Sequence, residues 1–134
     1  MTVADVCRSV PPVDPRSLTR SMAIARLVVG TGLALTPRLV TAPWLGKGAF
    51  GPAATVLARS MGARDAAIGA GQLASLGRGG TRGWLTAGLA SDVTDLAATV
   101  ASKDELPPTA VPLIIGAAGA GIVLGLYALG GADA

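Results

Sequence analysis

Six ionisable residues lie within stretches that are otherwise apolar enough to cross a membrane. They are three arginines and three aspartates: Arg26, Arg59, Arg64, Asp65, Asp92 and Asp95. A bilayer core accommodates such groups only where they face a protein interior or a watery cavity and find partners, so they are candidates for function. The chain has no histidine, the commonest acid–base group. The candidate catalytic acids or bases are therefore Asp65, Asp92 and Asp95.

The same stretches supply candidate ligand-binding groups, which are Arg26, Arg59, Arg64 and Gln72. Gln72 shares a row at helical spacing with Asp65 and Gly69, so its amide and the carboxylate face one side of a helix. Two interpretations stay open: an ion-pair network that only holds the helices together, or a polar pocket that binds a small molecule or moves a proton. Carboxylates flanked by arginines make a poor cation site, so we expect no metal ion and no cofactor.

Depth in the membrane predicts two pairings among these charges. With a rise of about 1.5 Å per residue, Arg64 and Asp92 lie near the middle of two consecutive antiparallel helices. Arg59 and Asp95 lie closer to the outer face, and Asp95 shares a helix face with Asp92. The sequence therefore predicts that Arg64 pairs with Asp92 and Arg59 with Asp95. Arg26, toward the start of the first helix, either joins the cluster or extends to the membrane surface.

The elements that must position these charges are long apolar segments. The 134-residue chain is 51% hydrophobic and only 14% charged, which is too apolar for an ordinary soluble domain. Each expected helix is long enough to cross a bilayer core of about 30 Å. The helices are expected at residues 21–40, 53–76, 83–102 and 110–129, and Pro37 is expected to bend or end the first of them. The predicted fold is all-α, a single bundle of four transmembrane helices within residues 21–130 that follows a polar tail at residues 1–20.

The remaining segments carry weaker signals. Residues 46–51 have the form of a dinucleotide-binding glycine fingerprint, but no strand is expected before them, so we do not expect a phosphate site. Cys7 is the only cysteine, which excludes an intrachain disulfide and leaves open whether this thiol is modified. Arginines and lysines are scattered over termini and loops without interleaved aromatics, which argues against nucleic-acid binding.

The basic residues also predict how the chain is oriented. Five of them are expected on the side of the termini and three on the other side. The first group is Arg8, Arg16, Arg20, Arg78 and Arg82, and the second is Arg38, Lys47 and Lys103. This bias predicts a multi-pass protein of the plasma (inner) membrane with both termini in the cytoplasm.

The fourth helix carries a small-residue motif without any charge. Gly121 and Gly125 stand in a small-xxx-small spacing, which lets two helix backbones approach closely. The motif either packs within its own bundle or joins copies of the chain into a homo-oligomer.

Three segments carry a resemblance to a known group of proteins. In chain order they are RLVVGTGLALTPRL, SMGARDAAIGAGQL and WLTAGLASDVTDLAATV. Over roughly residues 20–130 the chain resembles small four-helix membrane proteins, common in actinobacteria, that are catalogued mostly as domains of unknown function and are loosely DoxX-like. The resemblance implies a four-helix membrane bundle. A DoxX-type redox role is not carried over, because the chain has no cysteine pair.

These observations lead to two functional hypotheses. The first is a small integral membrane protein whose Arg/Asp cluster forms a polar pocket, and which serves as a binding or accessory subunit for a lipid or another lipophilic small molecule. The alternative is a membrane-embedded enzyme that uses an aspartate as acid or base on a lipophilic, isoprenoid-like substrate. Both hypotheses place the chain in the lipid bilayer.

Overall fold

The computed structural model describes residues 13–132, which form helices and connections without a strand in that range. Four long helices make the bundle: α2 (Pro15–Leu35), α4 (Pro52–Ser75), α5 (Thr81–Ala101) and α6 (Ala110–Gly130). A short helix α3 (Pro37–Leu45) and a 3-10 helix η1 (Gly46–Phe50) connect α2 to α4. The all-α prediction is confirmed. The last three long helices begin and end within two residues of the predicted positions.

The first helix departs from the prediction at both ends. Residues 15–20, which the sequence assigned to the polar tail, form the first turns of α2. Asp14 caps this helix because its carboxylate accepts a hydrogen bond of 2.8 Å from the N–H of Ser17, and Pro15 occupies the first helical position. At the other end α2 stops at Leu35, and Pro37 starts α3. The predicted interruption at Pro37 is confirmed. Cys7 and Arg8 lie outside the described residues.

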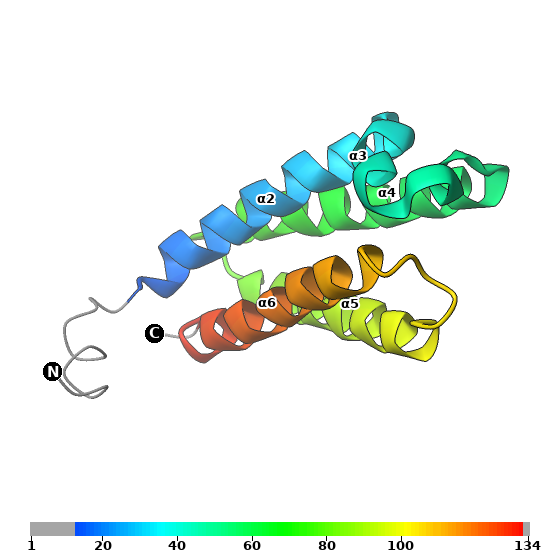
Figure 1. Ribbon diagram of the computed structural model, residues 1–134. Helices are drawn as coiled ribbons and strands as arrows, with labels where there is room; N and C mark the ends of the chain where they lie inside the picture. The colour runs from blue at the N-terminus through cyan, green and yellow to red at the C-terminus, as the bar shows by residue number, and fades with distance from the viewer. Residues whose placement is uncertain (1–12, 133–134) are drawn as a thin grey trace, which may run out of the picture.

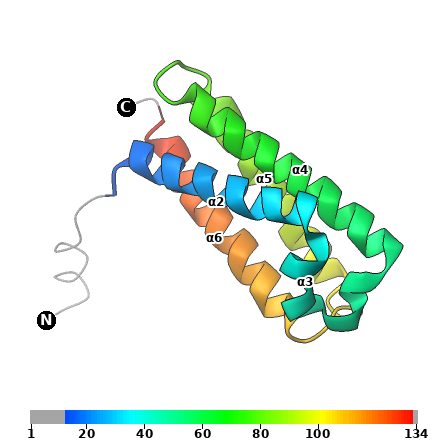
Figure 2. The same ribbon diagram turned by 90° about the horizontal axis from the view of Figure 1, so that it is seen from above.

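Figure 1 shows the long helices in two layers, one made of α2 and α4 and the other of α5 and α6. The start of α2, the α4–α5 connection and the end of α6 lie together, and we call this the terminal end of the bundle (Figures 1 and 2). At this end a Cβ atom added to Gly131 would overlap the ring of Pro15. The segment of α3 and η1 lies at the opposite end, with the α5–α6 connection.

Glycines bring α2 and α4 together until their backbones touch. A Cβ atom added to Gly30 would lie 2.6 Å from the carbonyl oxygen of Gly62, and one added to Gly69 would lie 2.6 Å from the carbonyl oxygen of Ala23. Such distances are too short for real side chains, so only glycine fits at these positions. Small residues at helix contacts are the usual means of close packing between membrane helices. We call Gly30, Gly62 and Gly69 the glycine seam.

The exterior of the bundle is apolar, and its interior is built mostly from small or polar residues with a few aliphatic side chains. Val28, Leu35, Leu57 and Val123 are each more than half exposed. Leu85 and Gln72 are the largest fully buried side chains of the described residues. Two helices, α2 and α6, are long and apolar enough to cross a membrane. The charged residues within α4 and α5 lower the mean hydropathy of these two helices, so the two do not meet the same criterion of length and apolar composition.

Candidate functional site

Arg26 joins both layers of the bundle through a single guanidinium group. It projects from α2, and its Nη2 lies 2.5 Å from Oδ2 of Asp92 on α5. The same nitrogen donates to the carbonyl oxygen of Gly88 at 3.3 Å. Its Nη1 lies 3.5 Å from Oδ1 of Asp65 on α4. Arg26 therefore belongs to the charge cluster and does not extend to the surface, which decides between the two predicted alternatives.

Arg64 makes a second connection between the two layers, from α4 to α5. Its Nη1 and Nη2 donate to the two carboxylate oxygens of Asp95 at 3.2 and 2.7 Å, a bidentate geometry that is among the stronger forms of ion pair. Its Nε lies 3.3 Å from Oδ1 of Asp65. Five charged residues thus share one network, which we call the ion cluster: Arg26, Arg64, Asp65, Asp92 and Asp95.

The two predicted pairings are wrong. Arg64 pairs with Asp95 and not with Asp92, and Arg59 takes no part in the ion cluster. Arg59 is exposed on α4 and lines a shallow hollow with residues of the α2–α3 junction. Asp92 faces Arg26 instead, because it points toward α2 and α6 and away from Arg64.

The sequence nevertheless predicted correctly that Arg64 on α4 and Asp92 on α5 lie at similar depth along the bundle. Gln72 reaches the carbonyl oxygen of Trp84, and Asp65 lies beside Ser91, so Arg64 and Asp92 are at similar depth. The pairing failed because a guanidinium at the end of a long side chain reaches about one helical turn along the axis. Helix phase, and not depth alone, selects the carboxylate that it meets.

Asp92 is buried against a glycine of α6. A Cβ atom added to Gly121 would overlap the Asp92 carboxylate, so this glycine makes room for the charge. Gly125, one turn further, would place a Cβ atom 3.9 Å from Leu89 of α5. Both glycines of the small-xxx-small motif therefore face their own bundle, which is the first of the two predicted alternatives. A homo-oligomer through α6 stays a prediction.

Gln72 lies beside the ion cluster, as expected for a residue grouped with Asp65. Its side chain is 1% exposed, and its Nε2 donates to the carbonyl oxygen of Trp84 at 3.4 Å. Its Oε1 has no hydrogen-bond partner among the described residues, and neither has Nε of Arg26. A Cβ atom added to Gly88 would lie 3.2 Å from both Arg26 Nη2 and Gln72 Nε2, so the two side chains end over this glycine.

Several contributors to the site were not predicted. Gly88 and Gly121 have no side chain and so leave room for the charged side chains. The hydroxyl of Ser91 donates a hydrogen bond to Asp65 at 3.4 Å. Gly88 stands one helical turn before Asp92 on the same face, and this spacing could have indicated a close approach at that point. Gly121 could not be found in this way, since nothing in the sequence places α6 against Asp92.

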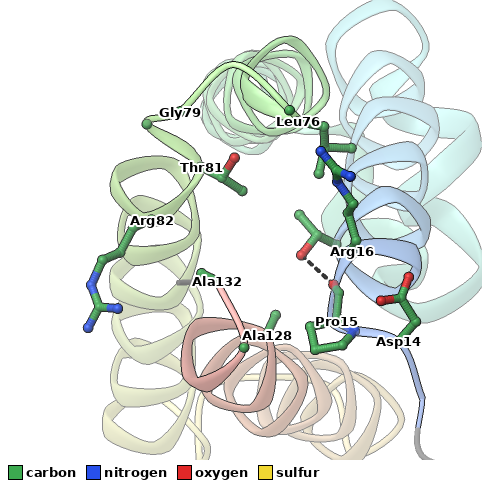
Figure 3. A pocket seen from close by; sticks show the side chains of 13 residues that line it. Asp14, Pro15, Arg16, Leu76, Gly79, Thr81, Arg82, Ala128 and Ala132 are labelled. Atoms are coloured by element: carbon green, nitrogen blue, oxygen red, sulfur yellow. Dashed lines mark hydrogen bonds between the residues drawn. The ribbon is translucent and has the colours of Figure 1, made fainter. Parts of the chain in front are cut away.

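A cavity of about 620 Å³ opens at the terminal end between the starts of α2 and α5, the α4–α5 connection and the end of α6. Figure 3 shows Thr81 and Ala128 directed into it, with Pro15 on its wall and Arg82 on the outer side of α5. Leu76 and Arg16 complete the wall beside the α4–α5 connection, where a Cβ atom added to Gly77 would lie 2.8 Å from Arg16 Nη2. The sequence did not predict this cavity.

The chemistry available at the ion cluster is set by its ion pairs. Asp65, Asp92 and Asp95, the candidate acids or bases, each contact a guanidinium, so an ionised carboxylate here serves first as an ion-pair partner. Within residues 13–132 no group of three or more Asp, Glu, His or Cys side chains is placed to hold a metal ion. The glycine-rich segment 46–51 forms η1 after a helix, without the strand that a dinucleotide site requires.

Searches with protein-family models, among curated proteins and among solved structures found no match to this chain. The resemblance to four-helix membrane proteins of the DoxX-like type therefore stays a prediction. Any proposal about function has to be argued from the residues and the geometry described above.

Proposed function

We propose that this chain is an integral membrane protein whose four long helices all cross the bilayer, and that it binds a small amphiphilic molecule in the cavity at its terminal end. In this role it serves as a binding or accessory subunit, while the ion cluster holds the helix layers together. The observation that carries the proposal is the cavity of about 620 Å³, whose walls combine apolar and polar side chains, within a bundle of apolar exterior.

Exposure of the most apolar helix supports a place in the membrane. Only 17% of the apolar window of α6 is buried. A core helix of a soluble protein with this composition would be mostly covered by other elements, because exposed apolar surface costs free energy in water. Leu113, Val123 and Leu126 project from α6 with more than half of their surface exposed. Such an exposed apolar surface is stable in contact with lipid.

The direction of the charged side chains supports membrane crossings by α4 and α5 as well. Arg64, Asp65, Asp92 and Asp95 turn toward the interior, where they form ion pairs with one another and with Arg26. The outward faces of the same helices carry apolar groups, among them Val56, Leu57 and Met61 on α4 and Val93 and Val100 on α5. Each of the two helices has at least 21 residues, which suffices for a bilayer core of about 30 Å.

The arrangement of the ends supports the predicted orientation. Four of the five basic residues expected on the cytoplasmic side lie on the terminal end of the described chain, namely Arg16, Arg20, Arg78 and Arg82. The excess of arginine at this end favours the cytoplasmic side of the plasma membrane.

The walls of the cavity favour an amphiphile as ligand. Pro15, Leu76 and Ala128 offer apolar surface, while Arg16, Thr81 and Asp14 place a cation, a hydroxyl and a carboxylate at the same cavity. A molecule with an apolar body and an anionic or hydrogen-bonding end would satisfy both kinds of surface. The ion cluster is a poorer ligand site, because Arg26 and Arg64 already contact carboxylates. The proposed ligand site therefore moves from these arginines to the terminal cavity.

Cysteine labelling tests the number of membrane crossings. In a Cys7→Ser background, Gly83→Cys places a thiol near the terminal end and Ser102→Cys places one at the opposite end, both on exposed positions. With four crossings, a membrane-impermeant maleimide added to intact cells labels Ser102→Cys, whereas Gly83→Cys reacts only after lysis. If only α2 and α6 crossed, both thiols would lie on one outer side and both would react on intact cells.

Mass spectrometry of the protein purified in a mild detergent tests the binding function. Wild type is expected to retain an amphiphile, and Ala132→Trp, which fills the cavity mouth, is expected to lose it. Ala117→Trp is the matched control, since Ala117 is exposed on α6 far from the cavity and this variant should retain the ligand. Equal recovery from all three proteins, or from none, would contradict the proposal.

A further inference from the structure

Arg59 is the one charge of the six singled out in the sequence that lies outside the ion cluster. Its side chain is exposed on α4 and has no ion-pair partner within residues 13–132. It stands seven residues after Pro52, the first residue of α4, which is about 10 Å along the helix. A charge at this depth is stable only if it finds an opposite charge or reaches the polar surface of the bilayer. A guanidinium that contacts the phosphate of a lipid headgroup meets both conditions.

A second arginine shares the surroundings of Arg59. The hollow that Arg59 lines has a volume of about 340 Å³, and it lies where α2 gives way to α3, at the end of the bundle opposite the termini (Figure 1). Arg38 of α3 lines the same hollow. Arg38 is exposed, and it too has no ion-pair partner among the described residues. We call this place the arginine hollow.

The described chain supplies no negative charge to the arginine hollow. Its other lining residues are Leu35, Thr36, Pro37, Leu39 and Thr55. The hydroxyls of the two threonines donate to the carbonyl oxygens of Gly32 and Gly51. Asp104 and Glu105, the acidic residues of this end, lie on the α5–α6 connection and do not line the hollow. Two positive charges are therefore left for a ligand to balance.

The glycine seam sets the level at which the two arginines meet. A Cβ atom added to Gly62 would lie 2.6 Å from the backbone nitrogen of Ala34, so this part of α4 touches the last turns of α2. Arg59 precedes Gly62 by three residues, which is about 4.5 Å toward the opposite end and level with the α2–α3 junction. At this junction Thr36 precedes a proline and leaves the helical conformation, with φ −127° and ψ 56°. The chain turns there and leaves the hollow beside α4.

A groove with mostly apolar walls extends from the arginine hollow along α2. It has a volume of about 450 Å³ and shares Leu35 and Thr36 with the hollow. Its other lining residues are Leu27, Val28, Thr31 and Gly32. From Leu27 to Thr36 the groove follows the helix for about 14 Å. We call it the α2 groove, and an extended acyl chain would cover its apolar surface.

We propose that the arginine hollow and the α2 groove together bind a phospholipid of net negative charge. Arg38 and Arg59 contact its phosphate, and one acyl chain lies in the α2 groove. A guanidinium binds phosphate oxygens through two parallel hydrogen bonds. A zwitterionic headgroup brings a cation of its own, so it balances the two arginines less well than an anionic headgroup does. The proposal rests on the membrane placement in the proposed function and not on the terminal cavity, which lies at the other end of the bundle.

Native mass spectrometry in a mild detergent, with phosphatidylglycerol or phosphatidylcholine added at equal concentration, tests the choice of headgroup. Wild type is expected to bind phosphatidylglycerol more tightly. Arg38→Gln and Arg59→Gln should each lower this affinity about fivefold, as expected for one basic residue near an anionic lipid. Lys103→Gln is the matched control, because Lys103 is exposed at the same end and does not line the hollow. Equal affinity for the two lipids, or arginine variants that bind no more weakly than Lys103→Gln, would overturn the proposal.

The variant Ala132→Trp separates this site from the terminal cavity. It fills the mouth of that cavity and should leave the arginine-dependent binding of phosphatidylglycerol unchanged. Binding that is lost in Ala132→Trp and kept in Arg59→Gln would place the lipid in the terminal cavity and would overturn the proposal. The cysteine labelling described above tests the membrane placement independently, so a failure of the placement and a failure of the lipid site are distinguishable.

A substitution in the α2 groove tests the acyl chain. Thr31→Trp fills the groove and should weaken the binding of phosphatidylglycerol. Ile24→Trp is the matched control, since Ile24 is exposed on the same helix outside the groove and this variant should bind as wild type does. Glycerol phosphate, which has no acyl chain, should compete only weakly. Full affinity in Thr31→Trp together with strong competition by glycerol phosphate would identify a site for free phosphate compounds and would overturn the assignment to a lipid. Circular dichroism of each variant verifies that it is folded.

Discussion

The glycine seam and the ion cluster hold the same bundle together in opposite ways. At the glycine seam, α2 and α4 meet because Gly30, Gly62 and Gly69 have no side chains, and backbone touches backbone. At the ion cluster, the two layers meet through the longest charged side chains of the interior, Arg26 and Arg64. The first contact depends on van der Waals packing, and the second on electrostatic neutralisation.

The difference shows which contacts tolerate movement. Adding a single methyl group strains the seam within the α2/α4 layer, because the nearest neighbours of each glycine are backbone atoms that cannot shift by themselves. The contact between the layers is made by flexible side chains next to the unpartnered atoms of Gln72 and Arg26. We infer that the α2/α4 layer behaves as a rigid unit and that adjustment between the layers takes place at the ion cluster.

The largest effect is expected where the ion cluster loses the residue that joins both layers. Arg26→Met leaves the buried Asp92 without its guanidinium and should lower the free energy of unfolding by about 3–5 kcal/mol. Unfolding by a denaturing detergent, followed by circular dichroism, measures it. Adding Asp92→Asn should recover part of the loss because the unpaired charge is then gone. A double variant that loses the sum of both single effects would show that the two residues are not coupled.

A smaller effect is expected at the glycine seam. A Cβ atom added to Gly62 would lie 2.5 Å from the carbonyl oxygen of Gly30, so Gly62→Ala should lower the free energy of unfolding by about 1–3 kcal/mol. Gly116→Ala is the matched control, since nothing lies within 4 Å of a Cβ atom there, and it should raise the free energy of unfolding by up to about 1 kcal/mol because alanine has the higher helix propensity. A loss from Gly116→Ala as large as that from Gly62→Ala would mean that close packing at the seam does not determine the effect.

Much of the fold follows from features that the sequence shows locally. Apolar runs of helical length predicted α4, α5 and α6, and Pro37 predicted the interruption after α2. The start of α2 was missed because residues 15–20 are polar, although Asp14 followed by Pro15 is a helix-start signal. The prediction rested on polarity alone, whereas capping chemistry determines where the helix starts.

The candidate site was predictable by residue type but not by partner. All five members of the ion cluster are among the charges that the sequence singled out, because ionisable groups in apolar helices need an interior. Their pairing depends on helix phase and on side-chain reach, which depth alone does not determine. The terminal cavity depends on three chain segments that are far apart in sequence, and no local pattern indicates that they leave a space between them.

A double-mutant cycle distinguishes the observed partner of Arg64 from the predicted one. Arg64→Met with Asp95→Asn should show a coupling free energy of about 0.6–1.7 kcal/mol, the range for polar contacts between membrane helices. The value is kept low because the Arg64 side chain is 35% exposed. Arg64→Met with Asp92→Asn should show a coupling below that range, since these two side chains do not pair. A stronger coupling to Asp92 would restore the pairing that depth predicted.

The smallest effect is expected for the arginine outside the ion cluster. Arg59 is exposed on α4, and it takes no part in the network of Arg26 and Arg64, so Arg59→Gln should change the free energy of unfolding by less than about 0.5 kcal/mol. The same detergent-unfolding measurement applies, with Arg26→Gln as the matched loss of one guanidinium inside the cluster. A loss at Arg59 comparable to that at Arg26 would mean that the cluster extends toward α3, and the count of three carboxylates to two guanidiniums would then no longer hold.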